Sequence, residues 1–206
     1  MMHRKQVLAL SALTLLLMFI CVIVFSWIVS SVNPSLPIRS MISEEGVRQF
    51  MGGFAYCLAS PLLVWLVLCS IAWGTFRYSG FCDAILCVYR GRPITYREKH
   101  ALIISAIFFI VFCIVIISLT FVPHAVLLGV TGELCPSAFT AGAVPLFAFI
   151  IIVLSLSYGI SCGKLGDLYQ VYKSLYVGIK MSASLWPIYI FVMQLYFAVM
   201  FVFFRK

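Results

Sequence analysis

Five long apolar stretches without a charged side chain constrain the fold of this chain more than any other feature. A helix needs about 20 apolar residues to cross the hydrocarbon core of a bilayer, and every stretch reaches that length. They run over residues 7–32, 54–73, 101–122, 141–162 and 181–204. A soluble fold is disfavoured because 64% of the residues are hydrophobic and 10% are charged. We therefore predict an all-α integral membrane protein with five transmembrane helices and a single membrane domain over residues 1–206.

The basic residues predict the orientation of these helices, because Lys and Arg concentrate in short cytoplasmic loops. With a cytoplasmic N-terminus, ten Lys and Arg residues lie inside and four lie outside. Segment 123–140, predicted to be external, contains neither type. Arg205 and Lys206 disagree with this orientation, and a re-entrant fifth stretch bent at Trp186 and Pro187 would bring them inside. We expect a multi-pass protein of the cell inner (plasma) membrane.

Charge and composition also limit the expected partners and cofactors. The net charge of +8 needs no nucleic-acid partner, because anionic lipid and the topology rule account for the basic residues. The eight cysteines include no Cys-x-x-Cys pair, and His3, His100 and His124 are scattered. We therefore predict no metal site, no cofactor and no nucleic-acid binding. The expected partners are the lipid bilayer and either a second copy of the chain or a second membrane subunit.

The first four stretches form two similar pairs, in which the second member has proline near its start and glycine near its end. Pro61 is followed by Gly74 in one pair, and Pro145 is followed by Gly159 in the other. This pattern predicts a weak two-fold internal repeat over residues 7–90 and 101–173. The alternative is the ordinary likeness between any two amphipathic membrane segments.

Prolines and glycines also predict how the helices pack. Pro145 and Pro187 are expected in first turns, where the missing N–H has no helical partner, whereas Pro61 lies deeper and predicts a kink. Gly159 and Gly163 form a G-x-x-x-G motif that allows a second helix to approach closely. The motif leaves close packing and dimerisation open.

Two short helices are expected beside the spans. Ser43 precedes Glu44 and Glu45, which predicts an N-cap, two first-turn acids and a helix running toward the second stretch. After Gly163, apolar residues at helical spacing predict an amphipathic helix at the membrane interface before the last span. This apolar stripe consists of Leu168, Val171, Tyr172, Leu175 and Ile179.

The spans lack the residues that intramembrane catalysis requires. None of the five stretches contains Asp, Glu, Lys, Arg or His, and no nucleophile with a base is found at membrane depth. We therefore predict that the protein is not an enzyme and has no catalytic residues. Gln194, Tyr158 and Ser157 are polar residues within spans and are candidates for a substrate path. The alternative is that these side chains bond helices together.

Two blocks of this sequence resemble the AbgT family of p-aminobenzoyl-glutamate transporters. The first block is Ile-Arg-Ser-Met-Ile-Ser-Glu-Glu-Gly-Val-Arg at residues 38–48, followed by Pro61, Gly74 and Gly80. The second block begins at Pro123 and is similar to a late part of the family's sequence. Its motifs are Thr131-Gly132-Glu133-Leu134, Pro136-Ser137, Val144-Pro145-Leu146, Tyr158-Gly159, Gly163, Asp167, Phe191 and Gln194.

The resemblance implies movement of p-aminobenzoyl-glutamate or related aromatic folate-pathway compounds across the inner membrane. Family members are much longer, and their substrate core of broken helices and re-entrant hairpins has no counterpart here. Residues 90–99 lead directly into the third stretch, as if the central core were left out. No family binding residue therefore transfers to a numbered position. The competing expectation is a non-transporting scaffold or regulatory subunit.

The predicted topology can be tested with two cysteines. Cys135 lies in the predicted external segment, whereas Cys87 lies between the second and third stretches. In intact cells a membrane-impermeant thiol reagent should label Cys135 and spare Cys87. Permeabilised cells serve as the control, because both thiols should then meet the reagent. Labelling of Cys87 alone in intact cells would reverse the orientation.

Overall fold

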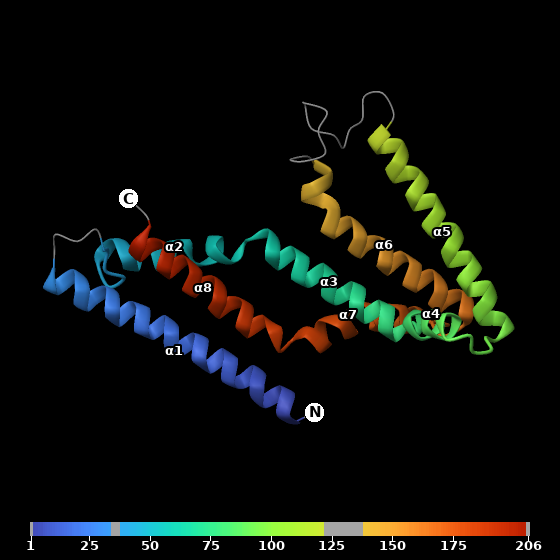
Figure 1. The fold of residues 1–206 in the computed structure, drawn as a ribbon, viewed down its shortest axis with the longest axis horizontal. Coiled ribbons are helices and arrows are strands. Elements are labelled where there is room, and N and C mark those ends of the chain that lie inside the picture. Colours follow the sequence, from blue (N-terminus) through green and yellow to red (C-terminus); the bar gives the residue numbers. More distant parts are fainter. Residues whose placement is uncertain (1, 34–37, 122–137, 205–206) are drawn as a thin grey trace. The chain divides into compact units, whose positions relative to one another are not determined.

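A computed structural model describes residues 2–33, 38–121 and 138–204, and these residues form eight α-helices and no strand (Figure 1). The external segment predicted at 123–140, with Cys135 and His124, lies mostly outside the described residues. The helices are α1 Met2–Val32, α2 Glu44–Leu58, α3 Pro61–Tyr78, α4 Phe81–Tyr89, α5 Tyr96–Phe121, α6 Ala138–Cys162, α7 Leu168–Ser182 and α8 Leu185–Phe203.

Within the described residues, five helical segments are long and apolar enough to cross a membrane, as the sequence predicts. They are Gln6–Val32, Glu44–Tyr78, Tyr96–Leu119, Gly142–Cys162 and Leu185–Phe204. Four of these segments lie in single helices. The second combines α2 and α3 and is longer than the stretch predicted at 54–73.

A break divides this second segment between α2 and α3. α2 ends at Leu58 and α3 begins at Pro61. Proline disfavours the helical conformation of the preceding residue, and its own missing N–H is harmless at the first helical position. Pro61 therefore starts a new helix, so the interruption expected at this proline is a complete break between two helices rather than a kink within one.

The start of α2 confirms the predicted N-cap. The hydroxyl oxygen of Ser43 accepts a hydrogen bond from the N–H of Gly46 at 3.2 Å, and Glu44 and Glu45 occupy the first turn. The side chain thereby satisfies one of the N–H groups that have no partner within the helix. The two carboxylates face the positive end of the helix dipole, which also stabilises the start of this helix.

The structure corrects the predicted position of Pro145. α6 begins at Ala138, so Pro145 lies inside the helix rather than in its first turn. The helix extends further toward its N-terminus than the apolar stretch indicated. Because proline has no N–H, the carbonyl of Ala141 lacks its usual helical partner. Pro187, in contrast, is the third residue of α8, in the first turn as predicted.

The contacts divide the chain into two units, which are described separately. Unit 1 comprises Met1–Leu63 and Ser182–Lys206, and unit 2 comprises Val64–Met181. This division does not follow the predicted repeats at 7–90 and 101–173, which stay a prediction. In unit 1, α1 and α2 both pack against α8 (Figure 1). The core of this unit is formed by Met41, Ala198, Phe201 and Val202.

Unit 1 also fixes the segment between α1 and α2. The Ser26 hydroxyl accepts a hydrogen bond from the N–H of Met41 at 3.1 Å and donates to the carbonyl of Ile23 at 2.8 Å. The N–H of Arg39 donates to the carbonyl of Val202 at 3.3 Å. These bonds connect the segment before α2 to α1 on one side and to the end of α8 on the other.

In unit 2, α5 packs along α6, and α4 contacts α6 (Figure 1). Ala84, Ala101 and Tyr158 form the buried cluster at these contacts. α7 follows α6 as the amphipathic helix predicted from the sequence, with Leu168 and Tyr172 strongly exposed.

A close approach of two helices in unit 2 joins α3 to α7 at Gly74 and Gly178. A Cβ atom added to Gly178 would overlap the carbonyl oxygen of Ser70, and one added to Gly74 would overlap the backbone of Gly178. Only hydrogen atoms fit at these two positions, so the backbones of the two helices lie in direct contact.

We expect Gly178→Ala to destabilise the protein. Alanine ordinarily favours a helix over glycine by about 1 kcal/mol, but overlap with a packed backbone costs about 1–3 kcal/mol. Gly142→Ala is the matched control, because an added Cβ meets nothing there within 4 Å. Thermal unfolding in detergent should show a lower midpoint for Gly178→Ala alone. Equal midpoints for both variants would contradict the close approach.

Candidate functional site

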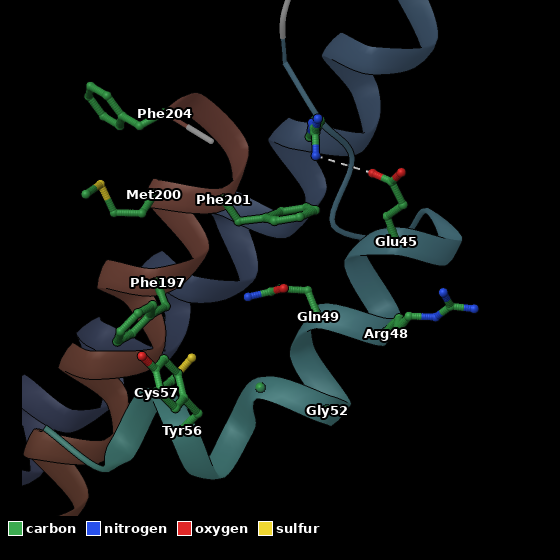
Figure 2. Close-up of a pocket in the computed structure, with 12 residues that line it drawn as sticks. Glu45, Arg48, Gln49, Gly52, Tyr56, Cys57, Phe197, Met200, Phe201 and Phe204 are labelled. Atoms are coloured by element: carbon green, nitrogen blue, oxygen red, sulfur yellow. Dashed lines mark hydrogen bonds and ion pairs between the residues drawn. The ribbon is translucent and has the colours of Figure 1, made fainter. Parts of the chain in front are cut away.

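A groove of about 880 Å³ lies within unit 1 between α2 and α8 (Figure 2). Its volume falls within the range of small-molecule sites, which is about 300–1,000 Å³. The lining residues come from the segment before α2, from α2 itself and from the end of α8. They are Arg39, Glu45, Arg48, Gln49, Gly52, Gly53, Tyr56, Cys57, Phe197, Met200, Phe201 and Phe204.

The charged lining residues all lie near the start of α2. The Arg39 guanidinium pairs with the Glu45 carboxylate at 3.4 Å, and Arg48 pairs with Glu44 at 3.6 Å. All four side chains are substantially exposed. Exposed pairs of this kind contribute only about 0–1 kcal/mol, so they can be exchanged for a ligand at little cost.

The opposite wall is apolar and comes from α8. Phe197, Met200, Phe201 and Phe204 recur at spacings of three and four residues, which places them along one side of the helix. On α2, Gly52 faces open space, because an added Cβ would meet no atom within 4 Å. The absent side chain leaves room for the groove.

A second cavity of about 20 Å³ borders the groove and shares four lining residues with it, which are Gln49, Cys57, Phe197 and Phe201. Gln194 lines this cavity, is only 7% exposed, and its Nε2 has no hydrogen-bond partner among the described residues. A buried donor without a partner costs about 1–3 kcal/mol. The cavity has the volume of one water molecule, which can accept from this amide.

The break between α2 and α3 lies in the same unit and is held by Tyr189 of α8. The Tyr189 hydroxyl donates to the carbonyl of Leu58 at 2.8 Å and lies 2.8 Å from the Ser60 hydroxyl, which donates to it. Helix ends leave carbonyl groups without helical partners. At this break the Leu58 carbonyl accepts from both the Tyr189 hydroxyl and the N–H of Ser60, each at 2.8 Å.

The residues predicted for a substrate path fall in different units. Gln194 lies in unit 1 beside the groove, whereas Ser157 and Tyr158 lie in α6 of unit 2 and do not line the groove. Tyr158 is fully buried against Phe81 in the cluster between α4 and α6, and Ser157 is half-buried. Only Gln194 among the three therefore contributes to the cavities described here.

The two glycines of the G-x-x-x-G motif have different environments. A Cβ added to Gly159 would lie 2.5 Å from Leu165 Cδ1 and 3.1 Å from Ser79 Cβ, so this residue packs closely within unit 2. Gly163 has φ +81°, faces open space and lies just beyond the last residue of α6. Its left-handed conformation favours glycine at the end of a helix.

Sequence reasoning missed the groove and the role of Tyr189. In the sequence, Arg39 and Arg48 count only as topology signals and Glu45 only as a first-turn acid, and Tyr189 is one of several aromatic residues in an apolar helix. A signal for the break existed, because Ser60-Pro61 interrupts an apolar stretch. No local pattern identifies which distant hydroxyl bonds to that break.

Neither metal-binding side chains among the described residues nor the comparisons with known proteins define the groove further. The described part of the chain holds no group of three or more His, Cys, Asp or Glu side chains placed to bind a metal ion. No protein-family model, curated protein or solved structure matches this chain.

We expect Tyr189→Phe to destabilise unit 1 by about 1 kcal/mol, because the Leu58 carbonyl loses one of its two hydrogen-bond donors and the Ser60 hydroxyl loses its acceptor. Tyr196→Phe on the same helix is the control, because Tyr196 is 52% exposed. Thermal unfolding in detergent should show a lower midpoint for the first variant than for the second. A midpoint unchanged from the wild-type protein in both variants would remove the proposed support of the break.

Proposed function

We propose that this chain is a multi-pass protein of the inner membrane with a cytoplasmic N-terminus. The proposal is supported by five helical segments of spanning length and by the excess of Lys and Arg in the segments that this orientation places inside. The exposure of large apolar side chains along α1 and α5 also supports it, since lipid is the solvent that favours such surfaces.

Within that membrane, we propose a role in moving p-aminobenzoyl-glutamate or related aromatic folate-pathway compounds. The observation that carries this proposal is the break in the second candidate span, where the Tyr189 hydroxyl of α8 donates to the carbonyl of Leu58. Transporters commonly build their sites from discontinuous helices near the bilayer midplane. The resemblance of residues 38–48 to the AbgT family supports the class of compound.

The chain is proposed to act in an assembly rather than alone. The five apolar stretches contain no charged residue, and the charged residues of the groove lie only near the start of α2. A polar solute crossing the bilayer needs partners along its whole path to replace its water. A second copy of the chain or a second membrane subunit would supply them.

A non-transporting scaffold or regulatory subunit is the second candidate. The direct contact of α3 with α7 at Gly74 and Gly178 favours it, because this contact uses small residues to fix a helix framework and contributes no polar group to a path. Under this alternative the protein would stabilise a partner without contacting solute.

Reconstitution separates the two candidates. The tagged chain is purified from native membranes in mild detergent, and its assembly is compared in proteoliposomes with the dissociated chain. We expect saturable, proton-coupled flux of p-aminobenzoyl-glutamate from the assembly and none from the chain alone. Saturable flux by a demonstrated monomer would contradict the requirement for an assembly.

Variants at the break between α2 and α3 test whether this chain takes a direct part in transport. Tyr189→Phe should lower flux through the assembly, and Tyr196→Phe should not. Flux that persists at the same rate when the chain is removed from the assembly would favour the scaffold. An assembly without flux of this compound would contradict the proposed class of substrate.

A further inference from the structure

The groove between α2 and α8 combines charged and apolar surfaces in an order that matches the depth of a membrane. Its charged residues Arg39 and Glu45 lie beside the end of α8, where the N–H of Arg39 bonds the carbonyl of Val202. Phe197 lies seven residues before Phe204, which is about 10 Å further along the helix axis. The charged lining residues therefore lie only toward the end of a candidate span, whereas aromatic residues of α8 line the groove from that end toward the interior.

Both signs of charge line the polar end. Two guanidinium groups, from Arg39 and Arg48, accompany the carboxylate of Glu45. The guanidinium groups suit a phosphate, and the carboxylate suits an ammonium group. In the structure Arg39 pairs with Glu45, and Arg48 pairs with Glu44 outside the lining. A headgroup with a phosphate and a primary amine can take Arg39 from Glu45 and supply the carboxylate with a new cationic partner, whereas an anionic headgroup without an amine supplies none.

The remainder of the groove suits a hydrocarbon chain. Figure 2 shows Phe197 and Phe201 on α8 beside the α2 residues Gln49 and Cys57. Gly52 supplies open space along α2. A groove of this kind within a bilayer fills with the surrounding lipid, because leaving apolar walls without contacts forfeits their dispersion energy.

We propose that this groove is a binding site for one phospholipid with an ethanolamine headgroup. Its phosphate contacts Arg39 and Arg48, its ammonium group contacts Glu45, and an acyl chain lies against Phe197 and Phe201. The site goes beyond the proposed function, since it requires only that unit 1 lies in a membrane. The bound lipid would be a structural component of unit 1. The solute would cross the membrane elsewhere in the assembly.

The test measures lipid retention by native mass spectrometry on the full chain in detergent. Phosphatidylethanolamine and phosphatidylglycerol are added separately at equal concentrations. We expect one retained phosphatidylethanolamine per chain and retention about tenfold weaker for phosphatidylglycerol, which corresponds to about 1.4 kcal/mol. Equal retention of the two lipids would overturn the headgroup assignment.

Matched variants locate the site. Gly52→Leu fills the groove and should abolish retention, whereas Gly142→Leu, at a helical glycine with similar open space in unit 2, should leave it unchanged. Glu45→Gln should remove the preference for phosphatidylethanolamine, and Arg90→Gln, on unit 2, should not. Thermal unfolding checks that each variant is folded. Undiminished retention in folded Gly52→Leu would place the lipid elsewhere and overturn the proposal.

The outcome is independent of transport. Retention that depends on Gly52 and Glu45 supports the lipid site even where the assembly moves no p-aminobenzoyl-glutamate. Conversely, displacement of the retained lipid by p-aminobenzoyl-glutamate at a Gly52-dependent site would overturn the assignment to lipid, because the groove would then bind solute.

Discussion

Backbone hydrogen bonding is the constraint on which the rest of this structure depends. In the bilayer proposed for this chain, a carbonyl or N–H without a partner costs several kcal/mol, so the chain satisfies these groups internally. Helices do so along most of the described length. Where Pro61 interrupts the second candidate span, the carbonyl of Leu58 accepts hydrogen bonds from the Tyr189 hydroxyl and from the N–H of Ser60. α8 therefore supplies one of the two hydrogen bonds that this carbonyl accepts at the break.

The same constraint explains how small polar side chains are used. Ser70, Thr75 and Ser174 each donate a hydroxyl to a carbonyl three or four residues earlier in their own helix. These local bonds satisfy the hydroxyl without a partner from another helix. Gln194 differs, since its long side chain places a buried donor in a small cavity that no described residue fills. Gln194 is therefore a polar residue of unit 1 whose buried Nε2 donor is not satisfied within the described residues.

The groove with its charged residues and the backbone contact at Gly74 and Gly178 lie in different units. Unit 1 places its charged groove residues where the segment before α2 meets the end of α8, and unit 2 brings α3 and α7 into backbone contact through Gly74 and Gly178. In lipid, apolar surface does not drive helices together, so small residues and hydrogen bonds decide which helices approach closely. The proposed phospholipid would fill the groove between α2 and α8 in unit 1.

The sequence by itself determined the helical class, the five segments of spanning length, the N-cap at Ser43 and the amphipathic helix that became α7, because these features depend on local composition and spacing. It also identified Gln194 as unusual. Only the tertiary structure decided that Pro61 begins a new helix, that Pro145 lies within α6, and that Tyr189 bonds to Leu58, 131 residues away. Contacts over such separations depend on how helices pack, and similar apolar side chains at many positions carry little information about which faces meet.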